Sequence, residues 1–104
     1  MEGLIGVVST EKNGLVSKDS FSVDRGELGT SFDYNNITQQ GHYTARNATD
    51  TTNGPGYNFG ILDVWTTSYN QTVQMFYPTD GDESSRPKYR HRTSTGTWKS
   101  WKEL

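Results

Sequence analysis

The sequence contains no cysteine. A disulfide framework and zinc sites built from thiolates are therefore both excluded. Long apolar runs are also absent, and the segment 1–14 has neither the basic region nor the apolar stretch of a signal peptide. We accordingly expect no signal peptide, no transmembrane segment and no membrane insertion.

Aliphatic side chains are scarce, and the chain has little net charge. Leu, Ile, Val and Phe together fall below roughly 20% of the residues, the level at which disorder becomes a serious interpretation. Disordered chains, however, have few aromatic residues and a high net charge. This one has 12% aromatic residues and a formal charge of −2. We therefore expect a folded chain whose core is filled by aromatic rings, with subunit association supplying part of the buried surface.

The first third of the chain differs in character from the rest. Between residues 3 and 32, short apolar pieces such as Leu4-Ile5 and Leu15-Val16 are separated by Gly, Ser, Lys and Asn, and none has helical periodicity. Aromatic residues become frequent from Phe32 onward. We therefore predict an extended N-terminal arm at residues 1–31 and a compact domain at residues 32–104.

The compact part has the pattern of a small β-domain. Asp33 is placed to cap one helical turn over residues 34–37. Segments rich in β-branched and aromatic residues predict strands, with turn signals between them, at residues 43–47, 60–66, 72–77 and 88–93. Residues 67–71 form a plausible hairpin turn between the two strongest strands. The predicted fold is all-β, a compact antiparallel β knob with an extended N-terminal arm.

No arrangement of residues indicates catalysis. The nucleophile-elbow, phosphate-loop and dinucleotide motifs are absent. Asp80, Asp82 and Glu83 lack the full pattern of a calcium loop, so a solvated acidic turn is the better interpretation. His42 and His91 lie far apart in sequence, and ordinary histidines are the default. We predict no enzyme activity, no catalytic residue, no metal site and no cofactor.

Lys88, Arg90 and Arg92 alternate along one predicted strand and would share one face of it. A solvated strand face is the favoured interpretation, and a site for phosphate or an acidic glycan is the alternative. The overall acidic balance argues against nucleic acid as a partner.

Aromatic residues divide between expected packing and expected recognition. Trp65, Trp98 and Trp101 are assigned to the core because the chain is poor in aliphatic residues, with sugar stacking as the alternative. Tyr57 and Tyr69 lie in predicted loops and are expected to be exposed. Loop aromatics, amides and acids, together with the strand arginines, give the predicted ligand-binding residues: Tyr57, Asn58, Tyr69, Asn70, Asp80, Asp82, Arg90 and Arg92.

A succession of short motifs covers about residues 32 to 104. In order they are Asp33-Tyr34-Asn35, Gly41-His42-Tyr43, Asn53-Gly54-Pro55, Gly60-Ile61-Leu62-Asp63-Val64, Val73-Gln74, Arg92 and Gly96-Thr97-Trp98-Lys99-Ser100-Trp101. This set resembles the knob domain of R-type pyocin and bacteriophage tail fibres. Upstream, Ser9 to Lys18 resembles more loosely a segment that precedes such domains in phage tail proteins.

The resemblance implies a non-catalytic homotrimer at the tip of a tail fibre, located in the virion. Its implied partners are other tail proteins and a bacterial cell-surface polysaccharide or teichoic acid. It implies no shared receptor site. Our hypothesis is therefore a receptor-binding module, and the alternative is a spacer or trimerisation knob without its own ligand. A glycan-cleaving accessory domain is a third possibility.

Overall fold

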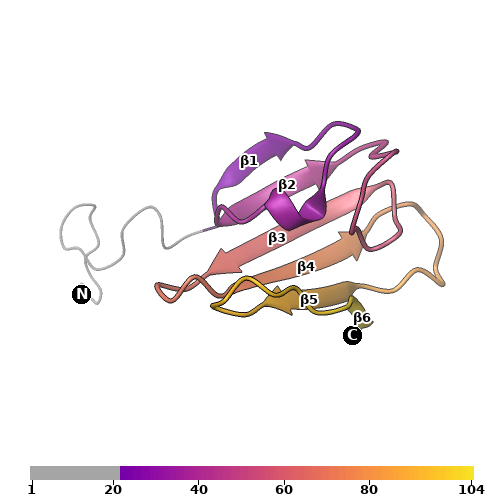
Figure 1. The fold of residues 1–104 in the computed structure, drawn as a ribbon. Coiled ribbons are helices and arrows are strands. Elements are labelled where there is room, and N and C mark those ends of the chain that lie inside the picture. Colours follow the sequence, from indigo (N-terminus) through magenta and orange to yellow (C-terminus); the bar gives the residue numbers. More distant parts are fainter. Residues whose placement is uncertain (1–21) are drawn as a thin grey trace, which may run out of the picture.

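The computed structural model describes residues 22–104 (Figure 1). Six strands form one sheet whose spatial order follows the chain order, and one turn of 3-10 helix, η2, is added to it. The elements are β1 (Asp24–Glu27), η2 (Tyr34–Asn36), β2 (Gly41–Ala45), β3 (Gly60–Thr66), β4 (Thr72–Pro78), β5 (Lys88–Arg92) and β6 (Lys102–Glu103). The all-β prediction is confirmed. No helix within residues 22–104 is long and apolar enough to cross a membrane.

The sheet is mixed, because β1 pairs with β2 in parallel while all other neighbouring strands are antiparallel. The predicted antiparallel arrangement holds for the other four pairs, and the β1–β2 pair departs from it. The segment 28–40 between the two strands includes η2 and crosses over one face of the sheet, so β2 starts again in the direction of β1 (Figure 1). β1 thus lies before residue 32, within the segment 1–31 for which the sequence predicts an extended arm. Residues 1–21, most of the predicted arm, lie outside the described residues.

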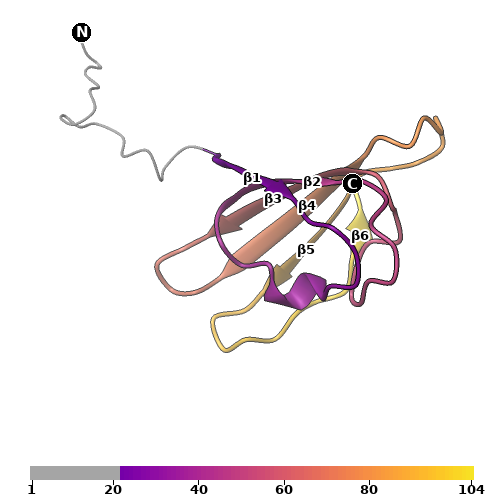
Figure 2. The same ribbon diagram turned by 90° about the horizontal axis from the view of Figure 1, so that it is seen from above.

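One face of the sheet is covered and holds the core. Side chains alternate along the strands, so Leu62, Val64 and Phe76 point to the same side and are fully buried. Tyr34 of η2 lies over them and is also fully buried. Figure 2 shows η2 and the chain between β5 and β6 on this side of the sheet.

Two local features shape this covered face: the helix cap predicted at Asp33, and the close approach of the Phe76 ring to the backbone of Gly60. The Asp33 carboxylate accepts from the backbone N–H of Asn35 at 2.9 Å and starts η2, as the sequence predicts. At Gly60, a Cβ atom would collide with the ring of Phe76 and with the backbone of Tyr77. A glycine is therefore required at position 60, because the Phe76 ring packs directly against the backbone of β3 there.

Candidate ligand-binding sites

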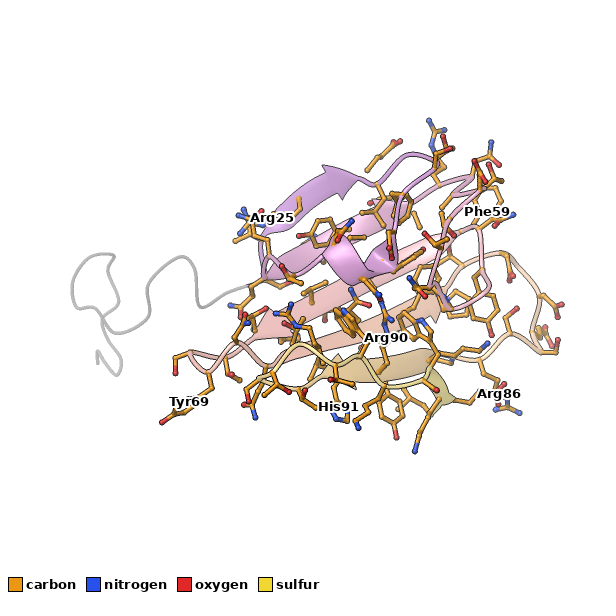
Figure 3. The ribbon with its side chains drawn as sticks, in the orientation of Figure 1. Arg25, Phe59, Tyr69, Arg86, Arg90 and His91 are labelled. Carbon is orange, nitrogen blue, oxygen red and sulfur yellow. The ribbon has the colours of Figure 1, made fainter. Side chains whose placement is uncertain are left out.

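The eight predicted ligand-binding residues do not form one site. Tyr57, Asn58, Asp80 and Asp82 lie in the β2–β3 and β4–β5 loops at one end of the sheet, whereas Tyr69, Asn70 and Arg92 lie at the opposite end. Arg90 is in the middle of β5. Figure 3 shows this separation through Tyr69 and Arg86 at the two ends and Arg90 between them.

The acidic residues of the β4–β5 loop hold the loop itself together. Asp80 accepts from the Asp82 N–H at 3.1 Å and from the Ser85 hydroxyl. Asp82 accepts from the N–H and the hydroxyl of Ser84, and these bonds hold the pKa of Asp82 below its usual value. No group of three or more His, Asp or Glu side chains within residues 22–104 is arranged to hold a metal ion.

Tyr57 was expected to be exposed, but its ring is half-buried and stacks on Phe76 with 5.9 Å between the ring centroids. Its hydroxyl donates to the Arg86 carbonyl at 2.9 Å and accepts from the Arg86 N–H at 3.1 Å. The expectation fails because the loop folds back over the end of the core. Tyr57 therefore joins two loops to the sheet, whereas the neighbouring Asn58 is exposed.

Arg90 was expected on a solvated face, but only 4% of its surface is exposed. Its Nε donates to Gln74 at 2.8 Å, and its Nη1 donates to Asn35 at 2.9 Å. The guanidinium also lies 3.9 Å from the ring centroid of Trp98 and 4.8 Å from that of Trp101. The expectation fails because the chain after β5 folds back and places both indole rings over this face.

Because of these contacts, Arg90 serves to hold the fold together. Gln74 is fully buried, and its amide donates to the carbonyl groups of Tyr34 and Ile37, so the sheet is tied to η2 through a continuous polar network. Burial lowers the pKa of Arg90 to about 10, which leaves it a cation at neutral pH. The Nη2 atom is buried and has no partner among residues 22–104.

An open pocket of about 540 Å³ lies beside this network, between η2 and the C-terminal segment. We call it the tryptophan pocket. Its lining residues are Asn35, Asn53, Arg90, Gly96, Trp98, Lys99, Ser100 and Trp101. Lys99 and Ser100 are exposed, and no side-chain hydrogen bond holds either of them within the described chain.

The walls of the tryptophan pocket are fixed by local bonds. Trp101 packs against the core, as predicted, and its indole N–H donates to the Asn53 carbonyl at 2.9 Å. The Asn53 side chain donates to Asp33, and this bond holds the pKa of Asp33 below its usual value. The pocket thus offers amides, a hydroxyl, an ammonium group and indole rings to a polar ligand. Sequence reasoning missed it because its three segments are far apart along the chain.

At the far end of the sheet, the β3–β4 hairpin is formed as predicted, and Tyr69 is 76% exposed. Arg92 donates to the side chain of Asn70 at 2.8 Å, so these two predicted residues do come together. Trp65 was expected in the core, but it is 40% exposed, because its register position in β3 turns it to the uncovered face of the sheet.

No protein-family model, curated protein or solved structure was found to match the chain.

Proposed function

We propose that this chain is a receptor-binding module at the tip of a bacteriophage tail fibre. It attaches, as a homotrimer, to a bacterial cell-surface polysaccharide or teichoic acid and is joined to other tail proteins. The resemblance of residues 32–104 to tail-fibre knob domains supports the tail-fibre part of the proposal.

The tryptophan pocket is the observation that carries the glycopolymer part. Amide and hydroxyl groups hydrogen-bond sugar hydroxyls, and indole rings offer a flat apolar surface beside them. Lys99 adds an exposed ammonium group, and Arg90 adds a buried positive charge behind it. The Asp33 carboxylate offsets part of the Arg90 charge, so the exposed Lys99 is the cation that favours a polymer with anionic groups, such as the phosphodiesters of teichoic acid.

A specific observation favours the alternative, a spacer knob without its own ligand. Both indole rings of the pocket already have structural partners, Arg90 for Trp98 and the Asn53 carbonyl for Trp101. A domain whose aromatic residues only maintain the fold would present the same contacts.

Adsorption to host cell walls separates the two functions. Ser100→Tyr fills the mouth of the tryptophan pocket and Lys99→Ala removes its exposed charge, and we expect both to lower adsorption without lowering the melting temperature. Thr79→Tyr and Arg86→Ala are matched controls, because both residues are exposed in or beside the loop at the distant end of the sheet. If the polymer is anionic, binding by the parent also weakens as salt rises.

Adsorption by Ser100→Tyr and Lys99→Ala at the level of the parent would exclude the tryptophan pocket. Tyr69→Ala then tests the hairpin: loss of adsorption in that variant moves the receptor site to the hairpin. If all three variants adsorb like the parent, the receptor site lies elsewhere on the chain. A parent that does not adsorb makes the spacer function the better proposal.

A further inference from the structure

The second face of the sheet has no layer over it within the described chain. Figure 2 shows η2 and the segment between β5 and β6 together on the opposite side. Three large apolar side chains of this uncovered face are substantially exposed, Ile61 at 43%, Trp65 at 40% and Val73 at 38%. Trp65 and Val73 are direct cross-strand partners, so their side chains form one continuous patch. We call this surface the open face.

One row of cross-strand partners runs over the open face from the first strand to the last. Its members, in order from β1 to β6, are Asp24, His42, Asp63, Met75, Tyr89 and Lys102. Residues directly opposite in a ladder share a face, so all six belong to the same surface. A contact of 4.0 Å between His42 and Asp24 agrees with this placement on the β1 side.

The charges of this row are separated. The two carboxylates, Asp24 and Asp63, lie on β1 and β3, and the lysine, Lys102, lies on β6 at the other edge. The residues between the two charged ends, Met75 and Tyr89, are half-buried and largely apolar in character. The row thus runs from two carboxylates on β1 and β3, through half-buried Met75 and Tyr89, to a lysine on β6, and the Asp63 carboxylate lies between Ile61 and Trp65 along β3.

The core behind the open face is small. Within residues 22–104 the fully buried apolar side chains are Tyr34, Ala45, Ala48, Leu62, Val64 and Phe76. Domains of this size are stabilised only marginally by one such core, and association is a common additional source of burial. Exposed apolar side chains gathered on one sheet face are also typical of protein interfaces.

We propose that the open face is the surface through which copies of this chain associate with one another. Copies arranged around an axis parallel to the strands, with their open faces inward, bring the β6 side of each copy against the β1 side of the next. Lys102 then meets Asp24 at the β1 edge, and Ile61, Trp65 and Val73 are removed from water. Such a heterologous contact closes into a ring, and three copies give the proposed trimer.

This inference rests on the proposed oligomeric state and adds the surface that produces it. The first experiment measures the solution mass of the 1–104 chain and two variants by light scattering. Trp65→Glu and Val73→Lys each place a charge in the exposed apolar patch of the open face, and we expect both to reduce the mass to that of one chain. Tyr69→Glu is the matched control, because it puts the same charge on a more exposed aromatic position outside the open face and leaves the mass unchanged.

The second experiment uses a variant that preserves the fold. The chain has no cysteine, so Val73→Cys introduces a single thiol on the open face and Tyr69→Cys a single thiol on the hairpin. In concentrated protein we expect a maleimide to modify Val73→Cys at least about tenfold more slowly than Tyr69→Cys, and dilution to reduce the difference to what the exposure of the two positions in a single chain explains.

Two results would overturn the proposal. A mass of one chain for the parent at high concentration removes both the trimer and this interface, and slow labelling of position 73 in such a monomer identifies the chain's own N-terminal segment as the cover. A parent oligomer that survives Trp65→Glu and Val73→Lys places the interface elsewhere and leaves the trimer and the glycopolymer proposal standing. An oligomeric parent that does not bind cell walls, in contrast, counts only against the glycopolymer proposal.

Discussion

At the scale of single residues, Tyr34 shows how burial controls ionisation. The side chain is fully buried, and its hydroxyl has no hydrogen-bond partner among residues 22–104. Burial raises the pKa of Tyr34 from 10.0 to about 12, because the phenolate would lose its hydration. The neutral phenol therefore contributes stability that is fully present below pH 10 and is lost as the pH rises through about 12.

Tyr34→Phe tests this directly. We expect stability at pH 7 to change by no more than about 1 kcal/mol, since no hydrogen bond is removed, and we expect the loss of stability between about pH 10 and 12 to become smaller. Urea unfolding across this range measures both. Arg90 changes stability in the opposite direction over the same pH range. Because its pKa is lowered, the folded protein loses this buried charge at a lower pH than the unfolded chain does. This effect is present in both parent and variant. An identical alkaline slope in parent and variant would contradict the assignment.

Arg90 joins several parts of the covered face through its contacts with Gln74, Asn35 and Trp98. Arg90→Lys keeps the charge but loses the planar group that reaches Gln74 and Asn35 together. We expect a cost of about 2 kcal/mol and a melting temperature about 10 °C lower. Arg86→Lys is the control, because Arg86 is exposed and hydrogen-bonds only through its backbone. Equal melting of Arg90→Lys and the parent would show that the network does not stabilise the fold.

At the scale of elements, the C-terminal segment depends on its tryptophans more than on its strand. β6 has only two residues, whereas Trp101 packs edge-on against Tyr34 and bonds to Asn53. We expect Trp101→Ala to cost about 3–5 kcal/mol, and Trp101→Phe, which keeps a ring but loses the indole N–H, to cost about 1 kcal/mol for the lost bond, plus the packing lost to the smaller ring.

Thermal melts of these variants provide the measurement. Tyr69→Ala serves as the reference for a surface aromatic and should stay within about 0.5 kcal/mol of the parent. Trp98→Ala should behave like Trp101→Ala, because its ring covers the buried guanidinium of Arg90. Unchanged melting together with lost glycan binding would mean that these rings recognise the ligand instead of maintaining the fold.

At the scale of the whole molecule, association and attachment are linked by effective concentration. A trimer presents three tryptophan pockets, and weak contacts to a repeating polymer reinforce one another when they are held together. We expect the trimer to adsorb to cell walls at least about a hundredfold more tightly than the monomeric Trp65→Glu variant. Both forms should bind a soluble single-repeat oligosaccharide equally, and calorimetry with that fragment is the control. A monomer that adsorbs like the trimer would remove avidity from the proposal.

The sequence by itself determined β3, β4, β5 and the hairpin between β3 and β4, whereas the strand predicted at residues 43–47 is β2 at Gly41–Ala45. β-branched and aromatic runs at residues 60–66, 72–77 and 88–93 match β3, β4 and β5 to within one residue, and Asp33 caps η2 as its side chain requires. These features depend on local propensity and on hydrogen bonds between neighbours in the chain, and both can be read directly from the sequence. Two-residue β6 and the parallel partner β1 carry no such local signal.

Only the tertiary structure decided which face of each strand is covered. Arg90 and Trp65 each lie in a strand whose side chains alternate between the two faces of the sheet. This alternation shows which residues share a face, but not which face is covered by other segments. The cover comes from distant segments, η2 and the chain after β5, which bury the arginine and leave the tryptophan exposed. The tryptophan pocket and the open face both follow from that choice, because each is made of residues that meet only once the cover is in place.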